Sequence, residues 1–170
     1  NHKGMVLANL NLGICRYRKV LPNYKQAHQY LLQALAATQS MAPDKATIYK
    51  NSIYNNIGIA QYQAGDYQAA IASYTQSLVY LPEGGEKPAR MAIAYMNLGE
   101  AYAAQGQFEV ADRWLGKALG LADGLGQRDK VALYNILGGA RQQAGDLHQA
   151  QVQLEIAVAV ADKSTINDGL

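Results

Sequence analysis

The chain has 170 residues, of which 49% are hydrophobic, and this length and composition suit one compact domain or a run of small repeats and exclude a disordered chain. Only 16% of the residues are charged, and 15 Lys and Arg against 13 Asp and Glu give a formal net charge of +2, which is too small to support a nucleic-acid partner. The single cysteine, Cys15, excludes an internal disulfide, and no apolar run approaches the roughly 18 residues that span a membrane. We therefore expect a cytoplasmic protein with no nucleic-acid or membrane partner.

Four stretches of the chain resemble one another when they are aligned on a glycine. They are NLNLGICRY (9–17), YNNIGIAQY (54–62), YMNLGEAYA (95–103) and YNILGGARQ (134–142). Each is followed by a second related stretch: YKQAHQYLLQAL (24–35), YQAAIASYTQSL (67–78), FEVADRWLGKAL (108–119) and LHQAQVQLEIAV (147–158). The shared glycines, Gly13, Gly58, Gly99 and Gly138, are 45, 41 and 39 residues apart. Internal repeats of this length are typical of helical solenoids.

Each repeat has two segments of helical periodicity separated by a short turn. The turns share a glycine with polar neighbours: QAGDY (63–67), QGQFE (105–109) and QAGDL (143–147). The glycine supplies a left-handed residue after the first helix, and Asp66 or Asp146 can cap the second helix by accepting from its free N–H groups. The turn is therefore suited to a helix hairpin.

The sequence thus predicts an all-α fold, a solenoid of about four antiparallel helix hairpins. The predicted helix pairs are 3–18 with 23–40, 45–64 with 67–81, 88–105 with 108–124, and 128–144 with 147–162. We expect these four pairs to form a single array over residues 1–162. Residues 163–170 have no clear periodicity and are expected to form a frayed tail or a linker.

The repeat glycines lie in the middle of predicted helices, where glycine costs roughly 1 kcal/mol relative to alanine. Close approach of the second helix is the expected compensation, because that helix carries a small residue at the same relative place: Ala27, Ala70, Ala111 and Ala150. Six aromatic residues are expected to fill the core around these crossings rather than to bind a cofactor: Tyr24, Tyr54, Tyr67, Tyr95, Phe108 and Tyr134.

At these residues the chain resembles the tetratricopeptide repeat family, whose signature combines W-x2-L-G-x2-Y, A-x3-F and a proline. The resemblance is strong for YMNLGEAY with GQFEVADRWLGKAL and for YNNIGIAQ with GDYQAAIASYTQSLVYLP, and weaker in the first and fourth repeats. The repeats exceed the family's usual 34 residues by about 5 to 11. They are similar in this to the long-repeat branch found in kinesin light chains, spindle-orientation adaptors and bacterial regulators. The resemblance implies that the four hairpins form a right-handed superhelical solenoid.

In such arrays the first helix of each hairpin lines a concave groove, which is the usual binding surface. Helical spacing predicts a groove lining that is mostly uncharged and polar, with a few apolar and aromatic residues. The expected partner-binding residues are Asn11, Tyr17, Arg18, Asn55, Asn56, Ile59, Tyr62, Gln63, Met96, Asn97, Glu100, Asn135 and Gln142.

Asparagine recurs two residues before the glycine in three repeats, as Asn11, Asn56 and Asn97. A carboxamide offers both a donor and an acceptor, so a row of asparagines could bind the backbone of an extended peptide, and the resemblance to the long-repeat relatives implies such a role. The alternative is that each asparagine bonds a neighbouring helix or water. The carboxylate clamp that holds chaperone tails is disfavoured, since its lysine and arginine positions are apolar or uncharged here.

No catalytic or metal-binding pattern stands out in the sequence. His2, His28 and His148 lie in different repeats without ligand spacing, and Cys15 lacks a neighbouring helix N-terminus to activate its thiol. The glycines of PEGGEKP (82–88) lack the Lys-Ser/Thr of a phosphate-binding loop. We therefore expect a protein that is not an enzyme and has neither a cofactor nor a metal ion.

The predicted function is a protein-interaction module that binds a peptide or helix of another protein, as the sensor or adaptor part of a larger signalling or regulatory protein. Two alternatives stay open: a self-assembly module, and a domain regulated by a small molecule or a peptide. Self-assembly has one candidate surface, because Val152, Ile156 and Val160 are spaced to form an apolar stripe on the last helix. A homodimer through this stripe is the form of self-assembly that the sequence suggests.

Overall fold

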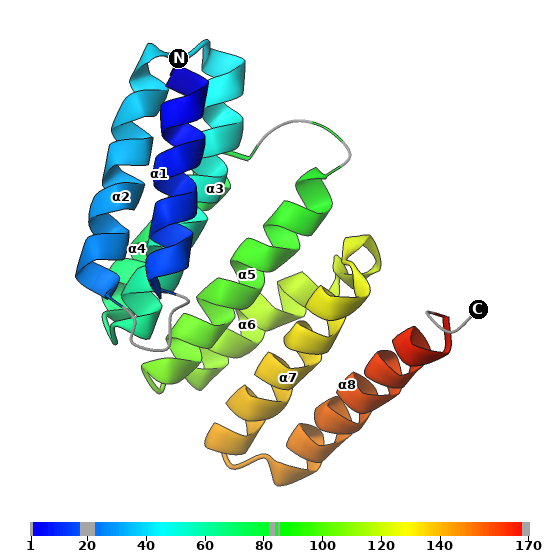
Figure 1. The fold of residues 1–170 in the computed structure, drawn as a ribbon. Helices are drawn as coiled ribbons and strands as arrows, with labels where there is room; N and C mark the ends of the chain where they lie inside the picture. Colours follow the sequence, from blue (N-terminus) through cyan, green and yellow to red (C-terminus); the bar gives the residue numbers. More distant parts are fainter. Residues whose placement is uncertain (1, 18–22, 82–83, 85, 168–170) are drawn as a thin grey trace. The chain divides into compact units, whose positions relative to one another are not determined.

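The computed structural model describes residues 2–17, 23–81, 84 and 86–167, and within these ranges all regular structure is helical (Figure 1). The chain divides into two compact units, Asn1–Lys87 and Pro88–Leu170, which are described separately below. The first unit contains α1 (His2–Tyr17), α2 (Tyr24–Ala37), the 3-10 turn η1 (Thr38–Ser40), α3 (Pro43–Gln63) and α4 (Tyr67–Val79). The second contains α5 (Lys87–Ala104), α6 (Phe108–Leu119), the 3-10 turn η2 (Ala122–Gly124), α7 (Gln127–Gln143) and α8 (Leu147–Asn167).

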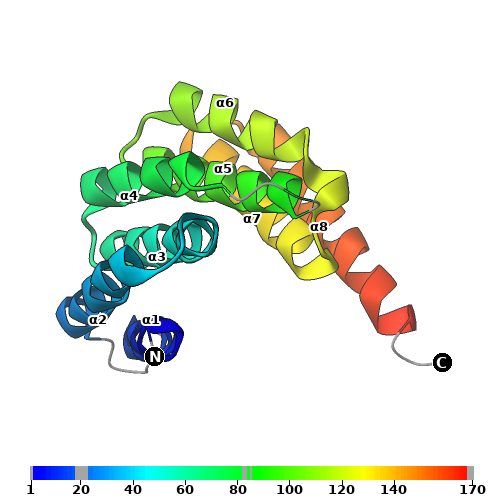
Figure 2. The ribbon, with the colours of Figure 1, turned by 90° about the horizontal axis from the view of Figure 1, so that it is seen from above.

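These elements confirm the predicted all-α fold of helix hairpins. The paired helices are α1 with α2, α3 with α4, α5 with α6, and α7 with α8, and α7 and α8 lie side by side in both views of the ribbon (Figure 1, Figure 2). We call the earlier member of each pair the first helix and the later member the second helix.

Three helix ends differ from the sequence-based expectation by three or more residues. The helix α2 ends at Ala37 because the Thr38 hydroxyl donates to the Leu35 carbonyl at 2.7 Å and the chain tightens into η1. The helix α6 ends at Leu119, followed by Gly120 and then η2. The helix α8 continues to Asn167, five residues further than expected, since no glycine or proline interrupts it before that point.

The turns within the hairpins have the predicted chemistry. Gly65, Gly106 and Gly145 have φ angles of 83°, 74° and 84°, which lie in the left-handed region that favours glycine. Asp66 Oδ1 accepts from the Ala69 N–H and Asp146 Oδ1 from the Gln149 N–H, both at 3.1 Å. Each of these carboxylates satisfies an orphan donor at the start of a second helix.

The repeat glycines allow the paired helices to approach closely, as the sequence predicted. A Cβ atom on Gly99 would lie 2.5 Å from Leu115 Cγ and 3.3 Å from the Ala111 carbonyl oxygen. Gly13, against Leu31 and Ala27, and Gly138, against Leu154 and Ala150, show the same arrangement. The glycine therefore leaves room for a leucine of the second helix, while the backbone of the alanine passes directly over it.

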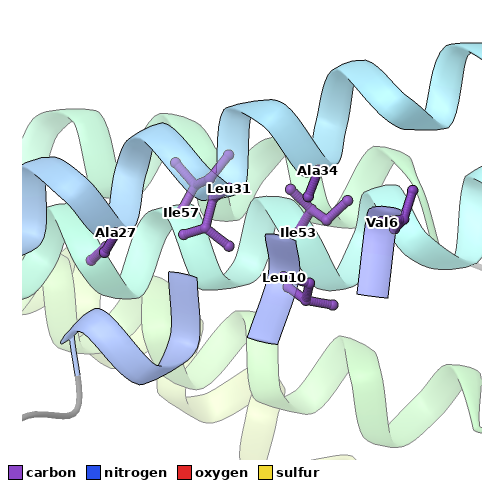
Figure 3. Close-up of a cluster of buried hydrophobic side chains, with 8 residues drawn as sticks. Val6, Leu10, Ala27, Leu31, Ala34, Ile53 and Ile57 are labelled. Carbon is purple, nitrogen blue, oxygen red and sulfur yellow. The ribbon is translucent and has the colours of Figure 1, made fainter. Parts of the chain in front are cut away.

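The two units have buried cores made of non-aromatic hydrophobic residues at matching positions of the repeat. In the first unit α3 covers the α1/α2 hairpin, and Figure 3 shows the buried side chains gathered between the three helices. In the second unit α7 covers the α5/α6 hairpin. Counted from the repeat glycines, the matched core pairs on the first helices are Val6 and Ala92, Leu10 and Met96, Ile53 and Leu133, and Ile57 and Leu137. Counted from Ala27 and Ala111, the matched pairs on the second helices are Leu31 and Leu115, and Ala34 and Ala118.

The aromatic residues contribute less to the core than the sequence suggested. The six expected core aromatics are only partly buried, and the fully buried positions are mostly occupied by aliphatic residues. The exception is Tyr74, which is 2% exposed and packs its ring on Gly58 at the place where the other second helices carry leucine. The aliphatic set, rather than the aromatic one, therefore fixes the helix crossings.

Candidate protein-interaction surface

The predicted stripe in the first unit lies on the neighbouring first helices α1 and α3 (Figure 1). Asn11 on α1 and Gln63 at the end of α3 are exposed. The remaining α3 residues of the stripe are half-buried: Asn55, Asn56, Ile59 and Tyr62. The Tyr17 side chain and Arg18 lie outside the described residues. The structure thus leaves a surface on these helices that carries amides with one aromatic and one aliphatic side chain.

In the second unit the predicted stripe needs one correction. Asn97 and Glu100 on α5 are half-buried, and Asn135 and Gln142 on α7 are exposed. Met96 is only 5% exposed and belongs to the core between α5, α6 and α7, so its inclusion among the binding residues was wrong. It occupies the register of Leu10, three residues before the glycine, where the side chain points into the hairpin.

Hydrogen bonds hold the side-chain amides of two asparagines on α3. Asn56 Nδ2 donates to the Ser52 carbonyl at 2.8 Å, one turn back on the same helix. Asn51 Nδ2 donates to the Ser77 carbonyl at 2.8 Å, across the hairpin. Asn51 is 5% exposed and was missed by the sequence analysis; the available signal was its register, which it shares with the core residues Val6 and Ala92. A buried amide there needs a partner, and the α4 carbonyl supplies it.

Two aromatic clusters are built on the tyrosine that stands four residues before the repeat glycine. In the first unit Tyr54 stacks on Tyr80 with ring centroids 5.5 Å apart, and Lys50 Nζ lies 5.0 Å from the Tyr80 ring. Burial, and secondarily the neighbouring Tyr80, raise the pKa of the Tyr54 hydroxyl above its usual value. Tyr54 therefore stays neutral at physiological pH.

In the second unit the equivalent Tyr95 packs against Trp114, with ring centroids 5.4 Å apart. Lys117 Nζ lies 4.1 Å from the Trp114 ring and 5.7 Å from the Tyr95 ring. These distances are those of cation–π contacts, which hold the lysine stem against the two rings. The cluster joins α5 to α6 within one hairpin.

Two surface grooves lie in the second unit, and almost none of the residues that line them were predicted to bind a partner. One, of about 630 Å³, lies between α6 and α7, where Arg141 pairs with Asp112 and, at 3.5 Å, with Asp146. The other, of about 470 Å³, runs along α8 and is lined by Gln142, Leu147, Ala150, Gln151, Leu154, Glu155 and Val158. Only Gln142 belongs to the predicted set. We call the second one the α8 groove.

The described residues contain no group of three or more His, Cys, Asp or Glu side chains placed to hold a metal ion. Within the same ranges of the chain, no helix combines the length and the apolar character that a membrane crossing requires.

Comparison with known families identifies the repeat. Two family models described as tetratricopeptide repeat match the sequence, one over residues 53–89 and one over residues 91–122. These matches support a protein of tetratricopeptide repeats, with repeats assigned at residues 53–89 and 91–122. Tetratricopeptide repeats generally mediate protein–protein interactions, and their fold is typically a non-catalytic interaction module.

Several solved structures share the fold of this tetratricopeptide repeat chain. BtubC (BKLC) from P. vanneervenii has a TM-score of 0.79 at 20% identity, over 100% of this chain and 67% of that one. A putative kinesin light chain from Podosopora anserina with nearly identical TPR-like repeats has a TM-score of 0.68 at 21% identity, over 94% of this chain and 76% of that one. MamA has a TM-score of 0.64 at 20% identity, over 94% and 80% of the two chains. The search of curated proteins gives no match.

Proposed function

We propose that the chain is a non-catalytic module that binds a peptide or a helix of a partner protein along the stripes of its first helices. In this proposal it acts as the sensor or adaptor part of a larger cytoplasmic signalling or regulatory protein. The tetratricopeptide repeats matched at residues 53–89 and 91–122 support a role in binding other proteins, because such repeats generally mediate protein–protein interactions.

The observation that carries the proposal is the recurrence of asparagine at one register of three first helices. Asn11 is exposed, and Asn56 and Asn97 are half-buried, each two residues before a repeat glycine. Asparagine is a poor helix former, so three of them at surface positions in helix interiors lower the intrinsic stability of the helices. A carboxamide can accept from one backbone N–H of a bound peptide and donate to one of its carbonyls.

The hydrogen bond from Asn56 to the Ser52 carbonyl supports this role, because it holds the side chain in one orientation before a partner arrives. A side chain that is already ordered loses less entropy when it binds. Asn55, Ile59 and Tyr62 flank it on the same helix and provide amide, aliphatic and aromatic contact surface. The stripe therefore combines backbone recognition by amides with non-polar contact area.

The experiment begins with a displayed library of unstructured peptides selected against the 170-residue chain. The affinity of the best peptide is then measured by calorimetry for the wild type and for the double variant Asn11→Ala, Asn56→Ala, whose two asparagines lie on the neighbouring helices α1 and α3 of the first unit. Two lost hydrogen bonds of about 1 kcal/mol each predict an affinity about 10- to 30-fold lower, with the melting temperature changed by only a few degrees.

The matched control removes two carboxamides from exposed positions of second helices, Gln33→Ala and Gln76→Ala. This control should bind the selected peptide as tightly as the wild type. Equal affinity for the wild type and the asparagine variant contradicts the proposed role of the stripe and favours self-assembly as the function of the array.

A further inference from the structure

The structure contains two junctions at which a hairpin is covered by the next first helix. At one junction α3 packs on α1/α2, and at the other α7 packs on α5/α6. The second helix contributes a leucine that rests on the repeat glycine, Leu31 or Leu115, and both are 0% exposed. The covering helix contributes an aliphatic residue directly before its own glycine, Ile57 at 3% or Leu137 at 5% exposure.

The α7/α8 hairpin presents the second-helix half of this junction to solvent. Leu154 rests on Gly138 as Leu31 and Leu115 rest on their glycines, yet it is 40% exposed. Leu147 and Val158, on the same side of α8, are 67% and 60% exposed, and with Leu154 they line the α8 groove. This groove is therefore an apolar seat of the kind that a first helix fills elsewhere in the chain.

The helix α1 presents the complementary half. Leu12 stands directly before Gly13, in the register of Ile57 and Leu137, but it is 41% exposed. Ala8, in the register of the core residues Ile53 and Leu133, is also exposed, and Met5 beside it is 54% exposed. The α1 surface thus carries side chains at the positions that cover a hairpin in both observed junctions.

We propose that copies of this chain dock head to tail, with α1 of one copy seated in the α8 groove of another. The contact continues the junction that the chain already forms twice within itself, with Leu12 of one copy in the place of Ile57 or Leu137 and Leu154 of the other in the place of Leu31 or Leu115. It is a heterologous contact, in which each copy uses two different surfaces. The proposal is independent of peptide binding by the first-helix stripes.

The proposed self-association surface, the α8 groove, differs from the stripe of Val152, Ile156 and Val160 that the sequence suggested. Val152, Ile156 and Val160 are each half-buried, whereas Leu154 and Val158 are more exposed. A symmetric contact between two α8 helices would set Leu154 against the same second-helix surface of its partner. In both observed junctions the leucine instead meets a first helix, which favours α1 as the occupant.

The test is sedimentation equilibrium of the 170-residue chain over a series of concentrations, with one variant on each surface. For the wild type we expect the weight-average mass to rise with concentration to at least twice that of one chain. Leu12→Asp and Leu154→Asp should each stay at the mass of one chain. An equimolar mixture of the two variants should reach the mass of two chains and no more, because each variant keeps one intact surface.

Circular dichroism melting establishes that each variant is folded, and Val158→Asp replaces Leu154→Asp if that variant is not. Val79→Asp is the matched control, since Val79 is 67% exposed on α4 and belongs to neither surface; it should assemble like the wild type. A wild type that keeps the mass of one chain overturns the proposal. So does a mixture that fails to pair, a normal assembly of Leu12→Asp, or a Val79→Asp variant that no longer assembles.

Discussion

Gly99 shows how a single missing side chain determines a helix crossing. Its added Cβ would lie 2.5 Å from Leu115 Cγ and 2.6 Å from Leu115 Cδ2, and Leu115 is fully buried. We predict that Gly99→Ala lowers the free energy of unfolding by about 1 to 3 kcal/mol, because overpacking a closed core costs more than the gain in helix propensity. Urea denaturation followed by circular dichroism measures the change.

Gly116 is the matched control on the partner helix. It lies inside α6, is exposed, and a Cβ placed there would meet no atom within 4 Å. The substitution Gly116→Ala should therefore stabilise the protein by about 0.5 to 1 kcal/mol. Equal effects of the two substitutions would show that glycine at position 99 is not required by packing.

The glycine–alanine crossings could be predicted from the sequence because both residues recur at fixed spacing. The residues that cover Met96 and the hydrogen-bond partner of Asn51 could not be predicted in this way. Met96 directly precedes Asn97 of the surface stripe, and it becomes a core residue because α7 packs against α5 and α6. The polar side chain of Asn51 can be buried because the Ser77 carbonyl, 26 residues away, accepts its hydrogen bond. Such a long-range contact has no local signal in a single sequence.

At the scale of the helix, the start of α6 differs from those of α4 and α8. Asp66 and Asp146 accept backbone N–H groups before α4 and α8, whereas Gln107 precedes α6 without a side-chain capping bond. We predict that Gln107→Asp raises the free energy of unfolding by about 0.5 to 1 kcal/mol, since aspartate both caps the helix and interacts favourably with its dipole. Thermal melting at neutral pH measures the gain.

The pH dependence of this gain provides the control. The new carboxylate stabilises the helix only when it is ionised, so its folded-state pKa is depressed and the gain disappears as the pH falls below about 4. The substitution Gln107→Asn, which caps without a charge, should keep its smaller gain at low pH. If Gln107→Asp has no effect at neutral pH, the α6 N-terminus is already satisfied by other groups.

Helix existence was predictable from periodicity, but the helix ends were only partly so. The turns with glycine and aspartate end and begin helices by local backbone chemistry, and those boundaries agree with the structure. The ends of α2 and α6 depend on 3-10 turns, in which a buried threonine or a glycine tightens the last turn of the helix. The periodicity of apolar residues continues through such turns and does not reveal them.

At the scale of the whole molecule, each unit has its own core, and the two cores have residues at matching repeat positions. This arrangement predicts which helices lose stability when a core residue of one unit is substituted. Leu31 and Leu115 occupy the same position in the two cores and are both fully buried. Replacing either leucine with alanine removes a buried side chain at a cost of about 2 to 5 kcal/mol. In a repeat array each hairpin contacts only its neighbours, so the loss should be greatest near the substituted leucine.

Hydrogen exchange measured by mass spectrometry tests this expectation with a pair of mirrored variants. Leu31→Ala should lower protection in α1, α2 and α3 by roughly a hundredfold while α7 and α8 lose much less. Leu115→Ala should give the reverse pattern, because Leu115 belongs to the core formed by α5, α6 and α7. A uniform loss of protection through all helices for both variants would mean that the units unfold together, so that a change at one binding surface reaches the whole chain.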